Sequence, residues 1–338
     1  MNPARSGVLC AGSVMVDVGK VIDVYPAPER LAMIESVSLS TGGPALNLAV
    51  DLARLGAPFP LAVAGVVGED THGDLVVEAL AEHGIDTSRI RRTDGAATSF
   101  TDAMVVRDGG TRTFFHHIGA NDLLGPADVD PASSTARILH LGAPGLHPAM
   151  DAAGGWVSAL AAAQAAGMHT NLELVSLEPD RIRAVAGACL PHLDSIIVNE
   201  IEAAALAGEE LAPVGADGAV DWAALERVAT RLVGLGVSTL AAVHLPAGCV
   251  AAAPGGLVWR QGSVLLPRDE IRSATGAGDA FAAAVVLGLH EGWPVADCLR
   301  AGVCAAAACL RGEGTSDGVL GVADCLALGD RHGFRPTT

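Results

Sequence analysis

The chain has 338 residues, half of them hydrophobic, which is enough to bury a large core as one α/β domain spanning 1–338. Its formal net charge of -17 argues against a nucleic-acid partner and against binding to an anionic membrane surface. The seven scattered cysteines indicate neither a disulfide framework nor a zinc site; because the apolar stretches 280–289 and 301–310 are too short to span a bilayer and no secretory leader is apparent, we expect a cytoplasmic protein.

The first strand is predicted at Val8–Val16, an apolar run that would deliver Asp17 to the edge of the sheet. From 18 to 40 the sequence alternates only in part and contains two prolines, which predicts short strands that form a flap rather than part of the core. A second stretch with strand character, 98–118, contains a Gly109-Gly110 turn and is predicted to complete this flap.

The first helix is predicted to open at Gly42-Gly43-Pro44 and to stop at Gly56. The paired glycines allow the backbone to approach a ligand closely, whereas the proline is expected at a helix start on structural grounds alone. Asn47 is a polar residue on the first turn of an otherwise apolar helix, and its amide both donates and accepts hydrogen bonds. We therefore treat Asn47 as a candidate binding residue.

Strands and helices alternate through the middle of the chain. A strand at 61–67 precedes a helix that ends at His83, and strands at 138–141 and 168–174 flank a helix at 148–166. This alternation is typical of a parallel sheet covered by helices on both faces. The strand at 168–174 carries Asn171 and Glu173.

The next strand, 195–198, is followed by Asn199 and by Glu202, which lie three residues apart at a helix start and so on one face of it. Such a pair can hold water on a Mg²⁺ ion, although helix capping alone would place the same residues there. A helix at 221–235 follows, then the remaining predicted elements: a strand at 239–245, a hairpin at 249–253 and 258–264, and an Ala-rich helix at 295–310.

The segment Ala274-Thr275-Gly276-Ala277-Gly278-Asp279-Ala280-Phe281 leads into another Ala-rich helix. Its glycines permit a tight turn, and the first amides of the helix are unpaired where the dipole favours negative charge. This geometry predicts a hole for an anion. An acid at the same place, Asp279, would repel a bound phosphate unless a proton or a metal intervenes, which suits a base facing a phosphoryl group.

Three simpler interpretations compete for this segment. Gly276 and Gly278 could make only a turn while Asp279 caps the helix. A dinucleotide fingerprint is disfavoured because the third glycine is missing. A P-loop is disfavoured because no Gly-Lys-Ser/Thr is present, and Lys20 is the one lysine of the chain.

Five motifs together resemble the ribokinase-like (PfkB) carbohydrate kinases from about residue 9 to about 314. They occur in the order and spacing of that family: Gly42-Gly43-x-x-x-Asn47, Gly68-x-Asp70-x-x-Gly73, Gly119-Ala120-Asn121, Asn199-x-x-Glu202 and Thr275-Gly-Ala-Gly-Asp279. The resemblance implies a three-layer α/β/α sandwich with a central, mainly parallel sheet and a small β-lid, here formed by parts of 15–41 and 96–118. It also implies ATP as the donor, Mg²⁺ as the helper, a small sugar as the acceptor, and a homodimer formed through the lid.

Carried over by position, the resemblance makes Asp279 the base and assigns the phosphoryl group to the backbone of Gly276, Ala277 and Gly278. The acceptor sugar would be held by Asp17, Gly42, Gly43 and Asn47, with Glu173 supplying a further carboxylate from the neighbouring strand. Asn199 and Glu202 would organise Mg²⁺ and phosphate. The nucleotide would be bound by Asn199, Thr275, Gly248 and Cys304.

The chain departs from the family pattern in three places. Ser273 stands where many relatives carry an acid that resembles a monovalent-cation ligand, so potassium activation is not expected. On the nucleotide side, Val243-His244-Leu245-Pro246-Ala247-Gly248 keeps one glycine of the usual Thr-x-Gly-x-x-Gly. Gly142 falls where ribokinases carry a glutamate, which weakens the case for ribose as the acceptor.

These observations favour an ATP-dependent sugar kinase and leave three alternatives. A nucleoside kinase of the same fold would stack a base on lid aromatics such as Phe100, Phe114 and Phe115. A non-catalytic sugar or nucleotide sensor is suggested by the altered sequence 243–248. An NAD(P)-dependent oxidoreductase rests only on the α/β pattern and Gly276-x-Gly278.

Overall fold

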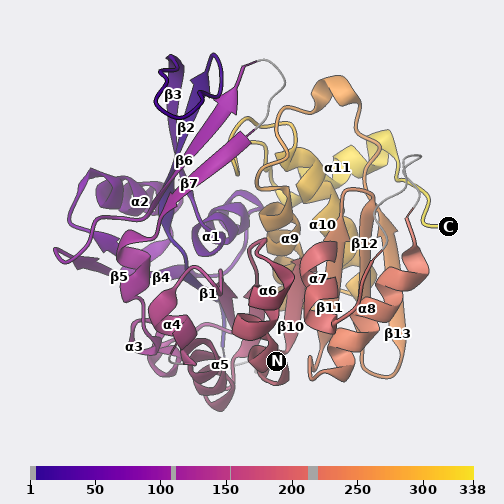
Figure 1. The fold of residues 1–338 in the computed structure, drawn as a ribbon. Coiled ribbons are helices and arrows are strands. Elements are labelled where there is room, and N and C mark those ends of the chain that lie inside the picture. Colours follow the sequence, from indigo (N-terminus) through magenta and orange to yellow (C-terminus); the bar gives the residue numbers. More distant parts are fainter. Residues whose placement is uncertain (1–4, 108–111, 153, 212–219) are drawn as a thin grey trace.

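The computed structural model describes residues 5–107, 112–152, 154–211 and 220–338. Within these residues the strands form two sheets (Figure 1). The large sheet has nine strands in the order β13-β12-β11-β10-β9-β8-β1-β4-β5, and the small sheet has four in the order β3-β2-β6-β7. The predicted Gly109-Gly110 turn lies outside the described residues.

The large sheet is parallel from β11 to β5, and the hairpin of β12 and β13 adds two antiparallel strands at one edge. Parallel strands buried on both faces explain the nearly continuous apolar runs of the sequence. The strands are β1 (Val8–Gly12), β4 (Leu61–Gly68), β5 (Asp86–Thr93), β8 (Ile138–Gly142), β9 (His169–Glu173), β10 (Ser195–Asn199), β11 (Leu240–Leu245), β12 (Gly248–Ala253) and β13 (Leu257–Gly262).

Helices cover both faces of the large sheet and enclose one hydrophobic cluster on each side. The first face carries α1 (Pro44–Arg54), α2 (Thr71–Glu82), α9 (Ala277–Glu291), α10 (Val295–Cys309) and α11 (Val322–His332). The second face carries α3 (Pro126–Val129), α4 (Pro148–Ala152), α5 (Gly155–Ala165), α6 (Pro179–Ala186), α7 (Glu200–Ala207) and α8 (Trp222–Gly234). The expected three-layer α/β/α sandwich is confirmed. No helix of the described part is both long and apolar enough to cross a bilayer.

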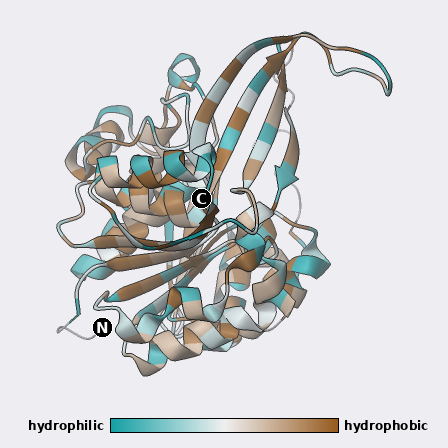
Figure 2. Ribbon diagram, turned by 90° about the vertical axis from the view of Figure 1, so that its left-hand side faces the viewer, coloured by the Kyte–Doolittle hydropathy of each residue, from teal (hydrophilic) through white to brown (hydrophobic). Residues whose placement is uncertain are grey.

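The small sheet projects from the sandwich beside the carboxyl ends of the parallel strands, and hydrophobic stretches alternate with polar ones along its strands (Figure 2). It consists of β2 (Met15–Ile22), β3 (Ile34–Gly42), β6 (Phe100–Val106) and β7 (Arg112–His117). These strands come from the two stretches that the sequence assigned to a flap.

The prediction of one strand over Val8–Val16 was wrong, because the chain leaves the large sheet at Gly12 and enters the small one at Met15. Gly12 has a φ of 136°, and a Cβ on it would lie 2.1 Å from the Gly142 oxygen, so the sharp exit depends on glycine. As a result Asp17 belongs to the small sheet rather than to the edge of the large one.

The single helix predicted at 148–166 is instead two helices, α4 and α5, because Gly154 adopts the left-handed conformation that separates them. Three elements were missed. Strand β5 is rich in charge because it is an edge strand, and α6 and α11 lie in polar stretches with little apolar periodicity.

Candidate active site

The amino end of α9 forms a tight turn built on Gly276, which has a φ of 84°. A Cβ at this position would lie 1.9 Å from the Thr315 oxygen, so glycine is required twice, for its conformation and for its size. The Ala277 amide makes one long bond, 3.4 Å, to the Ala274 oxygen, and the next amides of the first turn have no acceptor within the helix. The predicted anion hole therefore has the expected backbone geometry.

Asp279 and Asn47 meet at this turn although they are far apart in the sequence. Helix α1 packs against α9, and the Asn47 side-chain amide donates to Asp279 Oδ2 at 2.7 Å. Asn47 is 5% exposed and its Oδ1 has no hydrogen-bond partner among the described residues. Asp279 keeps part of its surface open to solvent. The contact holds the Asp279 carboxyl in a defined place at the mouth of the helix.

Glu173 lies beside Asp279, at the carboxyl end of β9. The two carboxyl groups hydrogen-bond to each other, and burial raises the pKa of both. The pKa of Glu173 reaches about 8, and the charge of Glu173 raises the pKa of Asp279 further. His140 Nε2 on β8 lies 3.3 Å from Glu173 Oε2.

Asp17 faces the same region from the small sheet. Burial raises its pKa to about 6 against the opposing effect of a hydrogen bond from Thr101, and the charge of Asp279 adds to the rise. A Cβ at Gly42 would lie 2.1 Å from Asp17 Oδ2, and one at Gly43 would lie 2.4 Å from the Ser13 oxygen. The paired glycines thus make room for Asp17 and for the close entry of the chain into α1.

Asn199 and Glu202 form a capping box at the start of α7. Asn199 Oδ1 accepts from the Ile201 and Glu202 amides, and Glu202 Oε2 accepts from the Asn199 amide at 3.1 Å. Glu202 is 4% exposed, and burial raises its pKa to about 7. Among the described residues no cluster of three or more His, Cys, Asp or Glu side chains has the geometry of a metal site.

The residues predicted to bind the nucleotide are not all brought together. Thr275 is exposed on the turn before α9, and its amide bonds to Ser273 Oγ at 3.2 Å. Gly248 opens β12 with a φ of 150°, where a Cβ would lie 2.2 Å from the Gln261 oxygen. Cys304 is fully buried in α10 and its thiol faces Gly329 of α11, so it has no surface that a ligand could reach.

Three neighbours of the site were not singled out from the sequence. Asp51 is a buried acid on α1 with no hydrogen-bond partner for either carboxylate oxygen in the described part of the chain, and burial raises its pKa well above the usual range. His244 ends β11 and packs its ring against Gly278. His140 is fully buried on β8. Polar residues inside predicted apolar elements were the available signal for all three.

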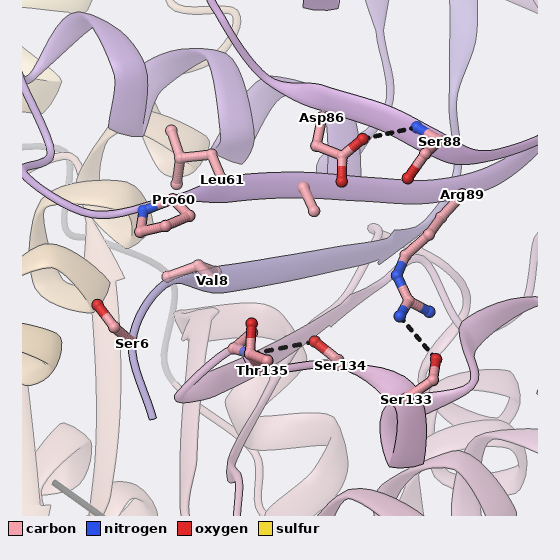
Figure 3. A pocket seen from close by; sticks show the side chains of 12 residues that line it. Ser6, Val8, Pro60, Leu61, Asp86, Ser88, Arg89, Ser133, Ser134 and Thr135 are labelled. Atoms are coloured by element: carbon pink, nitrogen blue, oxygen red, sulfur yellow. Dashed lines mark hydrogen bonds between the residues drawn. The ribbon is translucent and has the colours of Figure 1, made fainter. Parts of the chain in front are cut away.

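A separate hollow of about 270 Å³ lies at the amino ends of β1 and β4, lined in part by Pro60, Asp86 and Arg89 (Figure 3). Arg89 is held there by Ser133 Oγ at 2.7 Å. None of the predicted site residues lines it. The hollow is therefore at the opposite end of the sheet from Asp279.

Comparison with known proteins agrees with this geometry. The sequence profile described as pfkB family carbohydrate kinase matches residues 6–320. The chain is 31% identical over 283 residues to the ATP-dependent ribose-1-phosphate kinase of Halopiger xanaduensis, a match that covers 82% of this chain and 83% of that protein. It is 27% identical to the 5-dehydro-2-deoxygluconokinase of Clostridium perfringens over 87% of this chain and 86% of that protein.

Among solved structures, the ribokinase of Arabidopsis thaliana complexed with ribose and ATP superposes with a TM-score of 0.78. The match covers 96% of this chain and 98% of that one at 24% identity, which compares the folds.

Proposed function

The chain belongs to the pfkB family of carbohydrate kinases, and from that premise we propose that it transfers the γ-phosphoryl group of ATP to a hydroxyl of a small sugar with Asp279 as the base. The observation that carries the proposal is the 2.7 Å contact that holds the Asp279 carboxyl at the amino end of α9. A carbohydrate kinase needs a proton acceptor beside an anion-binding turn, and this contact joins the two.

The reaction follows from this arrangement. Asp279 takes the proton of the acceptor hydroxyl, the oxygen forms a bond to the γ-phosphorus, and the bond from that phosphorus to the β–γ bridging oxygen breaks to release ADP. The backbone of Gly276, Ala277 and Gly278 stabilises the charge on the transferred group. Positioning and charge stabilisation provide most of the catalysis in such a transfer.

The acceptor is assigned to the space between the small sheet and α1. Asp17, Gly42, Gly43 and Asn47 converge there, with Glu173 behind them. The small sheet acts as a lid that excludes water while the phosphoryl group is exposed. On the nucleotide side we retain Thr275, Asn199 and Gly248 and drop Cys304, since its thiol is buried against α11.

Asn199 and Glu202 are the residues that would hold a Mg²⁺ ion. Their oxygen donors suit the ion, because Mg²⁺ usually keeps several waters and needs one or two carboxylates besides the substrate phosphates. Both side chains are committed to the capping box, so contact through water fits them better than direct ligation. The bound ion would neutralise phosphate charge.

The test is ADP release with ATP, Mg²⁺ and a panel of pentoses, hexoses, sugar acids and nucleosides. At least one sugar should give turnover, and Asp279→Asn should lower kcat by ~10²–10⁴ while acceptor binding persists, because only the proton acceptor is lost. Failure of every acceptor to release ADP, with binding of a sugar retained, would favour the sensor alternative. Full activity of Asp279→Asn would exclude it as the base.

A nucleoside acceptor is the second candidate. Phe114 is 61% exposed and lies on the same face of the small sheet as Asp17, two strand positions from His116, which pairs with Thr101 and Asp17 across the sheet. An aromatic ring in that place can stack on a base. Higher kcat/KM with adenosine than with any free sugar in the same panel would favour this candidate.

A homodimer through the lid is supported by the apolar side chains that the small sheet exposes. Val37, Leu39 and Phe115 are 60%, 58% and 52% exposed and lie on the face opposite Asp17. A group of exposed apolar side chains marks an interaction surface. The seven cysteines are all buried and free of disulfides, which supports the expected cytoplasmic location.

A further inference from the structure

A line of buried polar side chains crosses the interior of the large sheet and ends at Asp279. His169, Asn171 and Glu173 occupy alternate positions of β9, so they share one face of the sheet. His140 on β8 and Ser195 on β10 are their direct neighbours in the register. All five are at most 7% exposed. This face is otherwise apolar, and a buried polar group there is costly unless it is paired.

Each member of the line is within hydrogen-bonding distance of the next. His169 Nε2 lies 2.9 Å from Ser195 Oγ, which lies 2.8 Å from Asn171 Oδ1. Asn171 Nδ2 lies 2.8 Å from His140 Nδ1. His140 Nε2 lies 3.3 Å from Glu173 Oε2, and neither of these last two atoms has another hydrogen-bond partner among the described residues.

The donors of this line all point towards Asp279. Asn171 Nδ2 can only donate, so His140 Nδ1 accepts and the proton of the neutral imidazole is on Nε2. Burial lowers the pKa of His140 to about 4, which keeps the ring neutral. His140 therefore donates towards Glu173 Oε2, and the other oxygen, Oε1, is left for the hydrogen bond with Asp279.

Two carboxyl groups in contact cannot both carry a negative charge without a large repulsion, so such a pair holds one proton over a wide range of pH. We propose that Glu173 and Asp279 form a pair that must hold a single proton for phosphoryl transfer, and that His140 is the positioning residue that directs this proton towards Asp279. This inference rests on the proposed role of Asp279 as the base.

The proton count of the step is then defined. Before transfer, Glu173 is protonated and donates to the Asp279 carboxylate. Asp279 takes the proton of the acceptor hydroxyl as the new oxygen–phosphorus bond forms, so the pair goes from one proton to two and from one negative charge to none. After the products leave, the extra proton passes to water. The role of Glu173 is thereby to position and polarise Asp279 rather than to hold the sugar.

The pair is surrounded by other titratable groups, and the pH dependence of any variant has to be compared with theirs. They come from every packed element: Cys10 of β1, Asp17 of β2, Asp51 of α1, His140 of β8, Glu202 of α7, His244 of β11 and Cys309 of α10. The substitution Glu173→Gln leaves all of these in place and keeps the shape and the hydrogen-bonding capacity of the side chain.

The main experiment is the pH profile of kcat/KM for the wild type and for Glu173→Gln, with the best acceptor from the panel. The wild type should give a bell, with an alkaline limb near pH 8 where the shared proton is lost. In Glu173→Gln the amide cannot lose that proton, so the alkaline limb should disappear while the acid limb remains and activity at neutral pH stays within about tenfold. Glu291→Gln, at the far end of α9, should keep the full bell.

Three outcomes would overturn the proposal. One is an unchanged alkaline limb in Glu173→Gln. Another is a rise of the acceptor KM with kcat unchanged at all pH values, because that would make Glu173 a direct ligand of the sugar. The third is a wild-type profile with no alkaline limb between pH 7 and 9.5. A lack of turnover with every acceptor would instead refute the kinase assignment, and the two failures are thereby distinguished.

His140 is tested by a matched pair of variants. His140→Met removes the donor, so the Glu173 carboxylate loses stabilisation and the alkaline limb should move to higher pH by about one unit. His140→Gln retains an N–H near the position of Nε2 and should keep the limb within half that shift, about 0.5 unit. If both variants fold and give the wild-type limb, His140 has only a packing role. Circular dichroism and thermal unfolding verify that each variant is folded.

Discussion

At the scale of single residues, burial raises the pKa of several acids around Asp279. The pKa of Asp17 rises to about 6, that of Glu202 to about 7 and that of Glu173 to about 8. In each case loss of solvation is the largest cause, and neighbouring carboxylates add to it. The folded protein therefore retains protons that the unfolded chain releases near pH 4 to 5.

This difference predicts how stability depends on pH. An acid whose pKa is raised by folding contributes its full stability below its unfolded pKa and loses it as pH rises through the folded value. For Glu173 the loss spans the range from its ordinary 4.5 to about 8. The free energy of unfolding should be lower at pH 8 than at pH 5, and Glu173→Gln should remove roughly 1–3 kcal/mol of that loss.

Urea unfolding at pH 5, 6, 7 and 8 measures this effect for both proteins, and Glu291→Gln serves as the control on an acid that is 34% exposed. A Glu173→Gln variant whose stability falls with pH as steeply as that of the wild type would show that Glu173 is ionised in the folded protein at neutral pH.

At the scale of elements, α9 and α10 pack closely because small residues line their contact. Gly302 of α10 lies against the Phe281 ring, so that a Cβ would be 2.7 Å from the ring carbons, and Gly288 of α9 lies against Cys298. Nearly every residue of α9 after its first turn is buried. The position of the α9 amino end, and with it that of Asp279, depends on this packing.

A single methyl group at this contact should therefore be costly. Gly302→Ala forces the Phe281 ring or the helices apart, and we expect a loss of ~1–3 kcal/mol of stability together with lower kcat, because α9 carries the base. The matched control is Gly187→Ala, at the end of α6, where a Cβ meets no atom within 4 Å and φ is −58°. That change should be neutral or stabilising by up to ~1 kcal/mol.

Thermal unfolding and steady-state kinetics of the two variants, measured side by side, check this prediction. Equal stability of Gly302→Ala and Gly187→Ala would mean that the α9–α10 contact can relax without cost.

At the scale of the whole molecule, the small sheet has two different faces. One faces the site with Asp17, Thr101 and His116, and the other exposes Val37, Leu39 and Phe115. Covering the second face with the same face of another copy would bury these side chains and hold the lid over the acceptor space. The proposed dimer therefore links assembly to catalysis.

The variant Val37→Ser/Leu39→Ser should shift the protein towards the monomer and raise the KM of the acceptor, since removal of two apolar side chains weakens the contact. Sedimentation equilibrium over a range of concentrations measures the shift, and Leu257→Ser, at a 55% exposed position on β13 of the large sheet, is the control. A wild type that is monomeric at every concentration would refute the proposal.

The sequence by itself determined the family, the layered α/β architecture and most of the acidic and glycine residues now proposed for the site. It did so because glycine turns, helix starts and apolar runs are local features, and because five such features occurred in one order. The capping box of Asn199 and Glu202 and the turn at Gly276 are local in the same sense.

The tertiary structure alone decided which of these residues meet. The Asn47–Asp279 contact spans 232 positions of the chain, and His140 becomes a neighbour of Glu173 only through the register of β8 and β9. The same long-range packing buried Cys304 between α10 and α11 and moved Asp17 into the small sheet. Proton sharing depends on distance and burial, which arise only when separate elements pack together, and for that reason no local pattern could predict it.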